Sequence, residues 1–404
     1  MTLGWKEKRW ETHVNNGDRV RQRSLVTPLV AVVAVACGTK GPEYGPLVAN
    51  RDTVGDTVVV RIASGSLWGH PISATEDLRV GIAEGDGPEA FGEIDAVAVE
   101  SDGAILVFDG QVPALRRFSK SGTYLGTIGG KGEGPGEYAG RPNGMMVDRN
   151  GRIIVNDSGN GRLTAYSAEG EFLGSLGAAS GLRSLFGQAV AGDDEGRLYV
   201  HVLMVAPGPG MPTPWPIGAE VRNSSGAILD TIPPPMLDGE PATFFGVLPD
   251  GSILAATIRS SHFEIQQSDG RVVRVELPFE RVPYTEEEVA RLRTALRPAA
   301  AADGKSKVSV PETKAAYIDV LCGPGGRVWL RRPIEPRSKQ EAAAVPRFQA
   351  SILDVFEEDG TYLGAVELPR RSWPVVVSGE ELYVIQLGRY DEQYLVRLKV
   401  TFPK

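Results

Sequence analysis

The chain of 404 residues repeats itself, and this repetition constrains its fold more than any other feature. Residues 102–109 (DGAILVFD) align with residues 150–157 (NGRIIVND) at a shift of 48 positions, and residues 118–126 (FSKSGTYLG) align with residues 166–174 (YSAEGEFLG) at the same shift. Both segments have alternating apolar residues bounded by Gly, Asp and Asn, which is typical of antiparallel strands joined by tight turns. The sequence therefore predicts repeated units of antiparallel strands.

Less exact copies of the two segments continue along the chain. Copies of the first lie at 195–200, 250–254, 325–330 and 379–384, and copies of the second lie at 223–229, 267–273 and 357–364. A repeat of about 40–50 residues with four strands is typical of a β-propeller blade. We therefore predict an all-β fold over residues 55–404, a six-bladed β-propeller of four-stranded antiparallel blades. The blades are expected to begin near residues 94, 142, 187, 243, 316 and 374.

The last predicted blade lacks its outer strand, because the chain ends soon after the strand expected at 394–400. A segment with the pattern of an outer strand precedes the first blade, at residues 57–68 (TVVVRIASGSLW). Closing a ring removes exposed sheet edges. We therefore expect residues 57–68 to complete the sixth blade.

Composition agrees with a turn-rich all-β protein and excludes other classes. The 49 Gly and 29 Pro residues follow no G-X-Y period, which excludes collagen, and a hydrophobic content of 42% argues against wholesale disorder. The 43 Lys and Arg residues are outnumbered by 51 Asp and Glu residues. This balance gives no support to a nucleic-acid partner, which would require a basic stripe.

The N-terminus has the pattern of a secretory signal. Basic residues at 19, 21 and 23 precede an apolar run at 25–36, which is too short to span a bilayer because spanning needs about 20 apolar residues. Cys37 follows directly, and residues 34–37 (AVAC) resemble a bacterial lipoprotein signal, in which the cysteine is lipidated and becomes the mature N-terminus. The sequence thus predicts a signal peptide at 1–36 and a flexible tether at 37–54.

The predicted location is the cell envelope outside the cytoplasm, with a lipid anchor as the only membrane contact. Cleavage after Ala36 that releases a secreted protein is one alternative, and an uncleaved or cytoplasmic chain is another. The second cysteine, Cys322, lies in an apolar stretch where a free thiol packs as a small hydrophobic group. A disulfide with Cys37 is therefore not expected.

Residues 155–166 (VNDSGNGRLTAY) resemble an NHL repeat, with its Asp, Asn and Arg-hydrophobic pattern between the second and third strands of a blade. The wider chain resembles six-bladed propeller lipoproteins of bacteria, which carry glycine loops like the one at 132–138 (GEGPGEY). The resemblance implies a structural pair of Asp157 with Arg162, and a looser copy in blade 1 formed by Asp109 with Arg116 or Arg117. It implies no single activity, because propellers include lyases, hydrolases, receptors and scaffolds.

The irregular parts of the sequence are expected on one face. In a four-stranded blade, the loop between the second and third strands lies on the same face as the loop to the next blade. The insertions at 203–218, 279–314 and 331–347 fall in such loops, as do the glycine loops at 84–92 and 132–138. We therefore predict that this face binds a protein or a small-molecule ligand.

The insertion at 279–314 predicts a helix near residues 284–298. Thr285 and Glu288 have the spacing of a capping box, and Pro298 is expected to end the helix. A narrow apolar stripe indicates that the helix packs on the propeller. The stripe consists of Val289, Leu292 and Leu296.

The predicted binding site is a rim of mixed charge on the insertion-bearing face, formed where the second strand of each blade ends. Nearby aromatic residues are included because Tyr and Trp contribute strongly at interfaces. The rim residues are Asp109, Asp157, His201, Arg259, Arg331 and Gln386 (or Arg389), and the aromatic residues are Tyr138, Trp215, Tyr284 and Tyr390.

No catalytic residue and no resident cofactor are predicted. The chain has no G-x-S-x-G, H-E-x-x-H or P-loop motif, and His70, His201 and His262 fall in different blades, which disfavours a zinc site. Loop carboxylates offer oxygen ligands of the kind that Ca²⁺ or Mg²⁺ prefers, although solvated carboxylates are commoner. These are Glu84, Asp86, Glu133 and Glu137. The alternative function is a metal-dependent propeller lyase or hydrolase of the NHL or gluconolactonase-like kind.

Overall fold

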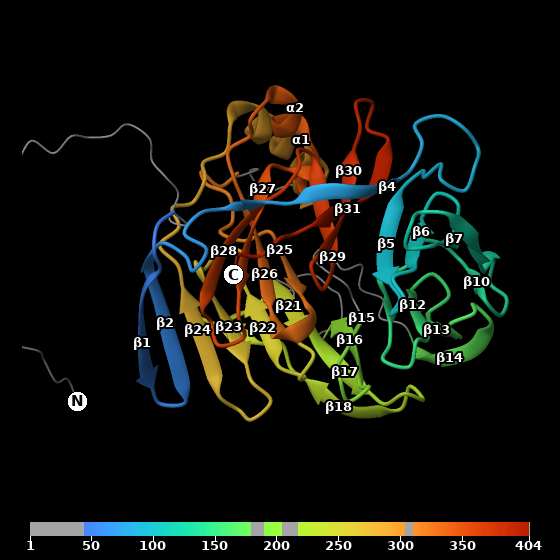
Figure 1. Cartoon of the computed structure of the whole chain (residues 1–404), viewed down its shortest axis with the longest axis horizontal. Helices are drawn as coiled ribbons and strands as arrows, with labels where there is room; N and C mark the ends of the chain where they lie inside the picture. Colours follow the sequence, from blue (N-terminus) through green and yellow to red (C-terminus); the bar gives the residue numbers. More distant parts are fainter. Residues whose placement is uncertain (1–43, 179–189, 204–216, 304–309, 404) are drawn as a thin grey trace, which may run out of the picture. The chain divides into compact units, whose positions relative to one another are not determined.

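The computed structural model describes residues 44–178, 190–203, 217–303 and 310–403 (Figure 1). All of these residues lie in one unit, Lys40–Lys404. The expected signal peptide at 1–36, Cys37 and Trp215 lie outside the described residues.

Each of the first five sequence repeats folds into four antiparallel strands that are hydrogen-bonded in chain order. Blade 1 contains β5 (Ile94–Val99), β6 (Ile105–Asp109), β7 (Ala114–Phe118) and β8 (Tyr124–Ile128). Blade 2 contains β11 (Met145–Val147), β12 (Ile153–Asp157), β13 (Arg162–Tyr166) and β14 (Phe172–Ala178). Blade 3 contains β15 (Val190–Gly192), β16 (Leu198–Leu203), β17 (Ile217–Arg222) and β18 (Ile228–Ile232).

The second half of the chain continues the same arrangement. Blade 4 contains β21 (Phe244–Val247), β22 (Ile253–Ala256), β23 (His262–Gln266) and β24 (Val272–Glu276). Blade 5 contains β25 (Asp319–Cys322), β26 (Val328–Pro333), β27 (Ser351–Phe356) and β28 (Tyr362–Glu367). Blade 6 supplies three strands, β29 (Ser372–Ser378), β30 (Glu381–Leu387) and β31 (Gln393–Lys399). Two short pairs lie between blades, β9 (Gly130–Lys131) with β10 (Glu137–Tyr138) and β19 (Met236–Leu237) with β20 (Glu240–Pro241).

The first strands of the blades contact one another in a closed cycle. β5 contacts β11, β11 contacts β15, and the series continues through β21, β25 and β29 back to β5. Figure 1 shows the blades in chain order, from cyan through green and yellow to red. The chain is therefore an all-β, six-bladed β-propeller with the blade starts that the repeats predict.

Repeated turn chemistry explains why the sequence repeats are visible. In blade 2, Asp148 Oδ1 accepts hydrogen bonds from the backbone nitrogens of Asn150 and Arg152, at 2.9 Å each. Gly151 has a φ of 78°, a left-handed conformation that favours glycine. Asp193 accepts the same two bonds in the corresponding turn of blade 3. The acidic residue and the glycine are thus required by the turn between the first and second strands.

The ring is closed by an N-terminal strand, but not by the predicted one. The outer strand of blade 6 is β4 (Thr75–Val80), which is antiparallel to β31 from Val80 opposite Leu395 to Thr75 opposite Lys399. β2 (Thr57–Ser64) instead lies parallel to β24 in blade 4, with β1 (Val48–Val54) on its outer side. β3 (Ile72–Ser73) adds to blade 5 beside β28. The expectation that residues 57–68 complete blade 6 is therefore wrong.

Burial explains which segment takes which position. β2 buries Val59, Val60 and Ile62, and Val60 and Ile62 join the apolar cluster between blades 4 and 5. β4 buries only Val80, so its polar sequence suits the solvent-facing edge of blade 6. Residues 48–54, expected within the tether, form β1.

A helical cap lies on the face that carries the insertions. The cap consists of α1 (Glu286–Asp303), α2 (Lys339–Ala343) and the 3₁₀ turn η2 (Pro346–Phe348), and a further turn, η1 (Pro324–Gly326), joins β25 to β26. The capping box of α1 is present, since Thr285 N donates to Glu288 Oε2 at 2.9 Å and Glu288 N donates to Thr285 Oγ1 at 3.3 Å. Pro298 does not end the helix, because an alanine-rich segment that favours helix follows it. No helix in the described ranges is long and apolar enough to cross a bilayer.

Candidate functional site

The predicted rim residues of blades 1 and 2 hold glycine loops in place. Asp157 is almost fully buried, accepts a hydrogen bond from Asn160 Nδ2 at 2.7 Å and lies 3.8 Å from Arg162 Nε. Arg162 Nη2 donates to the carbonyl oxygens of Gly134 at 2.5 Å and Glu137 at 3.0 Å. The Asp–Arg pair thus fixes the glycine loop at 132–138.

Blade 1 repeats this clamp. Asp109 is fully buried and lies 3.2 Å from Arg116 Nη2, while Arg117 pairs with Glu100 at 2.7 Å instead. Arg116 Nη1 donates to the carbonyl oxygens of Pro88 at 2.9 Å and Ala90 at 2.7 Å. The loop at 84–92 is therefore held like the loop at 132–138, and the carboxylates of Asp109 and Asp157 are occupied by these contacts.

Tyr138 does not offer an exposed aromatic surface. It is fully buried between blades 1 and 2, with its ring centroid 4.9 Å from that of Phe108 in an edge-to-face arrangement. Burial raises the pKa of Tyr138 far above its usual value. The expectation of Tyr138 as a contact residue is corrected, because the clamped glycine loop turns its ring into the core.

The rim residues of blades 3, 4 and 6 lie apart from one another. His201 is buried with its ring centroid 4.7 Å from that of Phe245, and loss of solvation lowers the pKa of His201 to about 4. Arg259 is exposed and pairs with Glu240 at 2.6 Å. Gln386 accepts a hydrogen bond from Arg79 Nη2 at 2.6 Å. These three side chains form no common site.

Arg331 belongs to a buried network that joins blades 5 and 6. Arg331 on β26 lies opposite Asp319 on the neighbouring strand β25. Asp319 Oδ2 accepts a hydrogen bond from Trp373 Nε1 at 3.1 Å. Arg331 donates to Ser351 Oγ at 2.8 Å and to the carbonyl oxygen of Gln349 at 3.1 Å. Burial raises the pKa of Asp319 and lowers that of Arg331 to about 10, and each charge opposes the shift of the other.

A group of partly buried charged side chains lies beside this network. Glu93 and Asp95 are at the start of β5, and Trp373 is at the start of β29. Arg347 Nη2 is 3.6 Å from Glu93 Oε1, and its guanidinium lies 5.2 Å from the ring centroid of Trp373. Arg141 pairs with Glu93 and lies 3.6 Å from Asp95 Oδ2. The hydrogen bond to Glu93 raises the pKa of Arg141. We call Glu93, Asp95, Arg141, Arg347 and Trp373 the axial rim.

The predicted site does not include the axial rim, because the prediction rests on residues at the ends of second strands. Glu93 and Trp373 stand at the starts of first strands, which lie on the same face and nearer the ring axis. Arg347 belongs to the insertion at 331–347. The sequence predicts the face on which this insertion lies, but it does not predict that the insertion reaches blade 1. The sequence signal for Glu93, Asp95 and Trp373 is a charged or aromatic side chain at the start of the first strand in blades 1 and 6.

The helical cap connects to the axial rim. α1 contacts α2, and Arg291 Nη1 donates to the carbonyl oxygen of Ala344. Ala344 and Phe348 pack in the apolar cluster that contains Ile94 and Tyr383, so the blade 5 insertion crosses blade 6 and reaches blade 1. The helical cap and the axial rim therefore form one continuous surface, which we call the insertion face. Most of the insertion at 203–218 lies outside the described residues.

A buried ion pair anchors α1 to the ring. Lys314 Nζ lies 2.7 Å from Glu288 Oε1, and both side chains are 1% exposed. Lys314 Nζ also donates to the carbonyl oxygen of Ile334 at 3.3 Å. Removing either partner would leave a buried charge unpaired, so the position of the helix is strongly determined.

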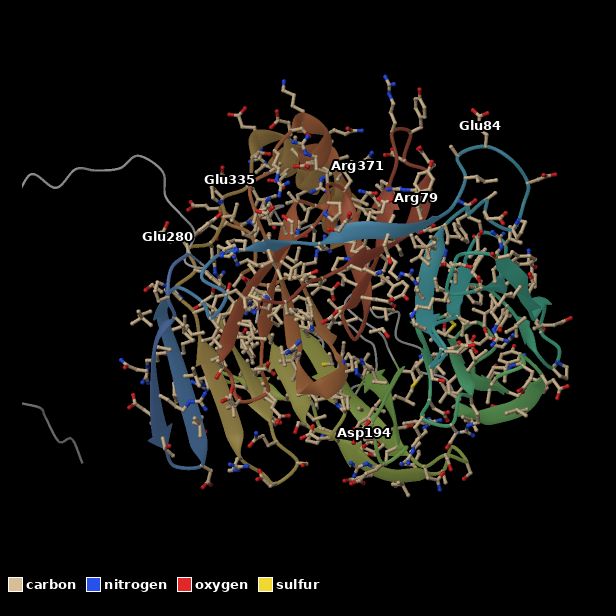
Figure 2. All side chains as sticks on the ribbon, in the orientation of Figure 1. Arg79, Glu84, Asp194, Glu280, Glu335 and Arg371 are labelled. Atoms are coloured by element: carbon tan, nitrogen blue, oxygen red, sulfur yellow. The ribbon has the colours of Figure 1, made fainter. Side chains whose placement is uncertain are left out.

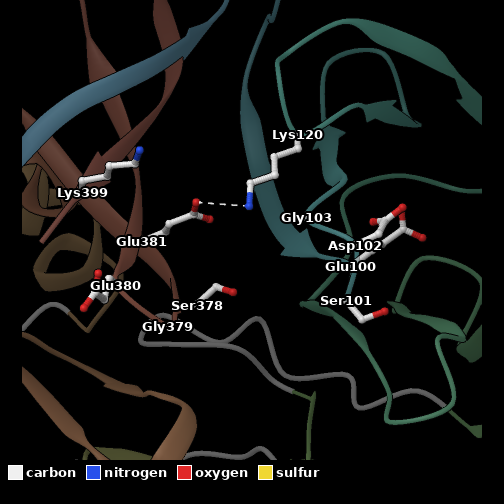
Figure 3. Close-up of a pocket in the computed structure, with 10 residues that line it drawn as sticks. All are labelled: Glu100, Ser101, Asp102, Gly103, Lys120, Ser378, Gly379, Glu380, Glu381 and Lys399. Carbon is white, nitrogen blue, oxygen red and sulfur yellow. Dashed lines mark ion pairs between the residues drawn. The ribbon is translucent and has the colours of Figure 1, made fainter.

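The opposite face carries a hollow of about 390 Å³ between blades 6 and 1 (Figure 3). Turn residues 100–103 and 378–381 line it, together with Lys120 and Lys399. Lys120 Nζ lies 3.8 Å from Glu381 Oε1, the contact drawn in Figure 3. The hollow is polar and of mixed charge, and we call it the seam pocket.

Within the described residues, no group of three or more His, Cys, Asp or Glu side chains is arranged to hold a metal ion. Glu137 Oε2 accepts a hydrogen bond from Gly134 N at 2.8 Å within its own loop. His262, at the start of β23 in blade 4, has its Nδ1 2.5 Å from Ser260 Oγ and its Nε2 3.7 Å from Asp238 Oδ2.

Comparison with protein families agrees with the fold. A family model described as 6-bladed beta-propeller matches residues 89–180. That stretch contains all the strands of blades 1 and 2 and the glycine loop between them. A search of the curated proteins finds no match.

Solved structures with similar folds share little sequence with this chain. A Bacteroides fragilis protein inferred to be exported has 12% identity and a TM-score of 0.48, over 82% of this chain and 99% of its own. Virginiamycin B lyase from Staphylococcus aureus has 11% identity and a TM-score of 0.42, over 88% and 99%. The calcium-binding protein regucalcin from Agrobacterium tumefaciens has 12% identity and a TM-score of 0.43, over 82% and 97%.

Proposed function

We propose that the protein is an extracytoplasmic, lipid-anchored β-propeller that binds a protein or small ligand on its insertion face. The observation that carries the proposal is the path of the blade 5 insertion. It crosses blade 6 and places Arg347 against Trp373 and Glu93.

The chemistry of the axial rim suits recognition. Arg347 and Arg141 have side chains that are 39% and 36% exposed, so their guanidinium groups are available to a ligand. Trp373 is held by the buried Asp319 beneath it. A fixed aromatic ring beside half-exposed arginines is the combination enriched where proteins bind partners.

A thermal-shift screen of peptides and small molecules against the purified chain tests this proposal. Ligands that stabilise the wild type should lose most of their effect in Arg347→Gln, because the half-exposed guanidinium beside Trp373 and Glu93 is removed. Lys399→Gln, in the seam pocket, is the matched control and should keep the effect. Ligands that depend on Lys399 and not on Arg347 would place binding on the opposite face and contradict the proposal.

The lipid anchor is supported by the apolar run at 25–36 followed by Cys37. In cells, Cys37→Ala should move the protein from the membrane fraction to the soluble fraction, because the acylated thiol is lost. Wild-type protein should also incorporate a radiolabelled fatty acid. Unchanged membrane fractionation of Cys37→Ala, with no label in the wild type, would contradict lipidation.

A further inference from the structure

The outer part of the insertion face is rich in arginine, although the whole chain has a net charge of −8. Residues 335–350, 370–371 and 388–392 contain five Arg and one Lys against four Asp and Glu. We call Arg337, Lys339, Arg370, Arg389 and Tyr390 the basic patch. It lies on α2, on the connection between blades 5 and 6, and on the β30–β31 turn.

Contacts show that these three segments form one surface. Arg370 Nε lies 3.5 Å from Glu341 Oε1, which ties the inter-blade connection to α2. Arg371 donates to the carbonyl oxygen of Gly388 at 2.5 Å and pairs with Asp391, which ties the same connection to the β30–β31 turn. Figure 2 shows Arg371 beside the helices, below that turn.

The cations of the patch make fewer internal contacts than the carboxylates of the same three segments. Arg337, Lys339 and Arg389 are exposed, and none has a carboxylate partner among the described residues. In contrast, three of the four acidic side chains of these segments make internal contacts. They are Glu341 with Arg370, Asp391 with Arg371, and Glu392 with the backbone nitrogen of Tyr390.

We propose that the basic patch binds an acidic segment of a partner protein. This inference rests on the proposed function, because it names the ligand class for the insertion face. Arg presents a planar fork that matches a carboxylate with two parallel hydrogen bonds, and the patch is Arg-rich. The three exposed cations of the patch outnumber Glu335, the one acidic side chain of these segments for which the described residues show no internal contact. A run of Asp and Glu is therefore complementary to the patch.

The form of the patch favours a peptide over a small molecule. Its residues are spread over three elements, and the β30–β31 turn projects beside α2 (Figure 1). Tyr390 at the tip is 81% exposed, and the guanidinium of Arg389 lies 5.6 Å from its ring centroid. An exposed Tyr next to Arg is the pairing found at the energetic centres of protein interfaces.

The test measures binding of a labelled oligoglutamate peptide to the purified full chain at low salt, with oligoglutamine of equal length as the neutral probe. Oligoglutamate should bind and oligoglutamine should not. Arg389→Glu should weaken oligoglutamate binding about tenfold, because a contacting charge is reversed. Arg271→Glu is the matched control, since Arg271 is a 65% exposed arginine on an opposite-face turn, and it should bind like the wild type.

The outcomes separate this inference from the proposed function. No binding of oligoglutamate, or equal loss in Arg389→Glu and Arg271→Glu, would overturn the acidic-segment proposal even if the screened ligands still depend on Arg347. Vesicles of phosphatidylcholine and phosphatidylglycerol form the second arm. If they bind in an Arg389-dependent way and oligoglutamate does not, the patch faces a membrane and the proposal is wrong.

Discussion

At the scale of single residues, burial decides whether a charged side chain is available for recognition. Asp319 and Arg331 are both buried, and their hydrogen bonds are made to Trp373, Ser351 and main-chain carbonyls. Arg347, one layer further out, is 39% exposed. The buried pair therefore holds the position of Trp373, and the exposed arginine is the group that can meet a ligand.

His201 provides a pH test at this scale. Its pKa falls from 6.5 in the unfolded chain to about 4 in the folded one, because its burial disfavours the charged form. A depressed folded pKa means that the unfolded state binds the proton first, so stability is lost as pH falls from about 6.5 towards 4, by up to the order of 3 kcal/mol.

His201→Gln should therefore flatten the fall in melting temperature between pH 6.5 and 4, since Gln takes up no proton in that window. His70→Gln, an exposed position, is the control and should follow the wild-type curve. The measurement is the melting temperature by circular dichroism across the pH range. Parallel curves for His201→Gln and wild type would contradict the buried, neutral histidine.

At the scale of elements, the repeats predict the blades well because the turn between first and second strands needs a particular chemistry. Asp148 and Gly151 must recur wherever the turn recurs. The closing strand was harder to predict because residues 57–64 and 75–80 are both short extended segments. Residues 75–80 become the outer strand of blade 6 because this position is exposed and because Asp77 contacts Arg397. Both features depend on the tertiary structure and are not visible in the sequence.

The candidate site was predicted only in part for the same reason. The face was predicted from loop positions, since strand direction fixes which loops share a face. The individual residues were not, because their burial is not visible in the sequence. Asp109 and Asp157 are covered by the glycine loops that their arginine partners hold, and Tyr138 belongs to such a loop and packs in the core. Burial of this kind depends on the neighbouring blade and leaves no local pattern.

The glycine-loop clamp predicts a local effect. Arg162→Ala removes the hydrogen bonds to Gly134 and Glu137 and leaves the buried Asp157 without its cation. We expect a loss of about 2 kcal/mol and faster amide hydrogen exchange in residues 132–138. Arg271→Ala, an exposed position, should change neither quantity. Unchanged exchange in that loop for Arg162→Ala would show that the clamp does not hold it.

At the scale of the whole molecule, one pair of strands closes the ring. Arg397 on β31 bonds to both carboxylate oxygens of Asp77 on β4, at 2.9 and 3.2 Å, and to the carbonyl oxygen of Lys120 in blade 1 at 2.9 Å. The hydrogen bond to Arg397 lowers the pKa of Asp77. One arginine therefore joins the first and last blades through the N-terminal strand.

Asp77→Asn should lower the melting temperature at neutral pH, by the equivalent of about 1 kcal/mol, because a charge-assisted bond becomes a neutral one. Because the folded-state pKa of Asp77 is lowered, its carboxylate stabilises the fold at pH values above the unfolded pKa of about 3.8. This stabilisation is lost as the pH falls through the lower pKa of the folded state. The difference between wild type and Asp77→Asn should therefore disappear in acid. Asp52→Asn, which breaks an exposed pair with Arg61, is the control and should cost little at any pH.

The central claim is that partners bind on the insertion face, and photo-crosslinking in the native cells tests it most directly. A photoreactive amino acid at position 390, on the insertion face, is compared with one at position 271, on the opposite face. The proposed function predicts a discrete adduct from position 390 that Arg347→Gln weakens, and none from position 271. An adduct from position 271 alone would contradict it.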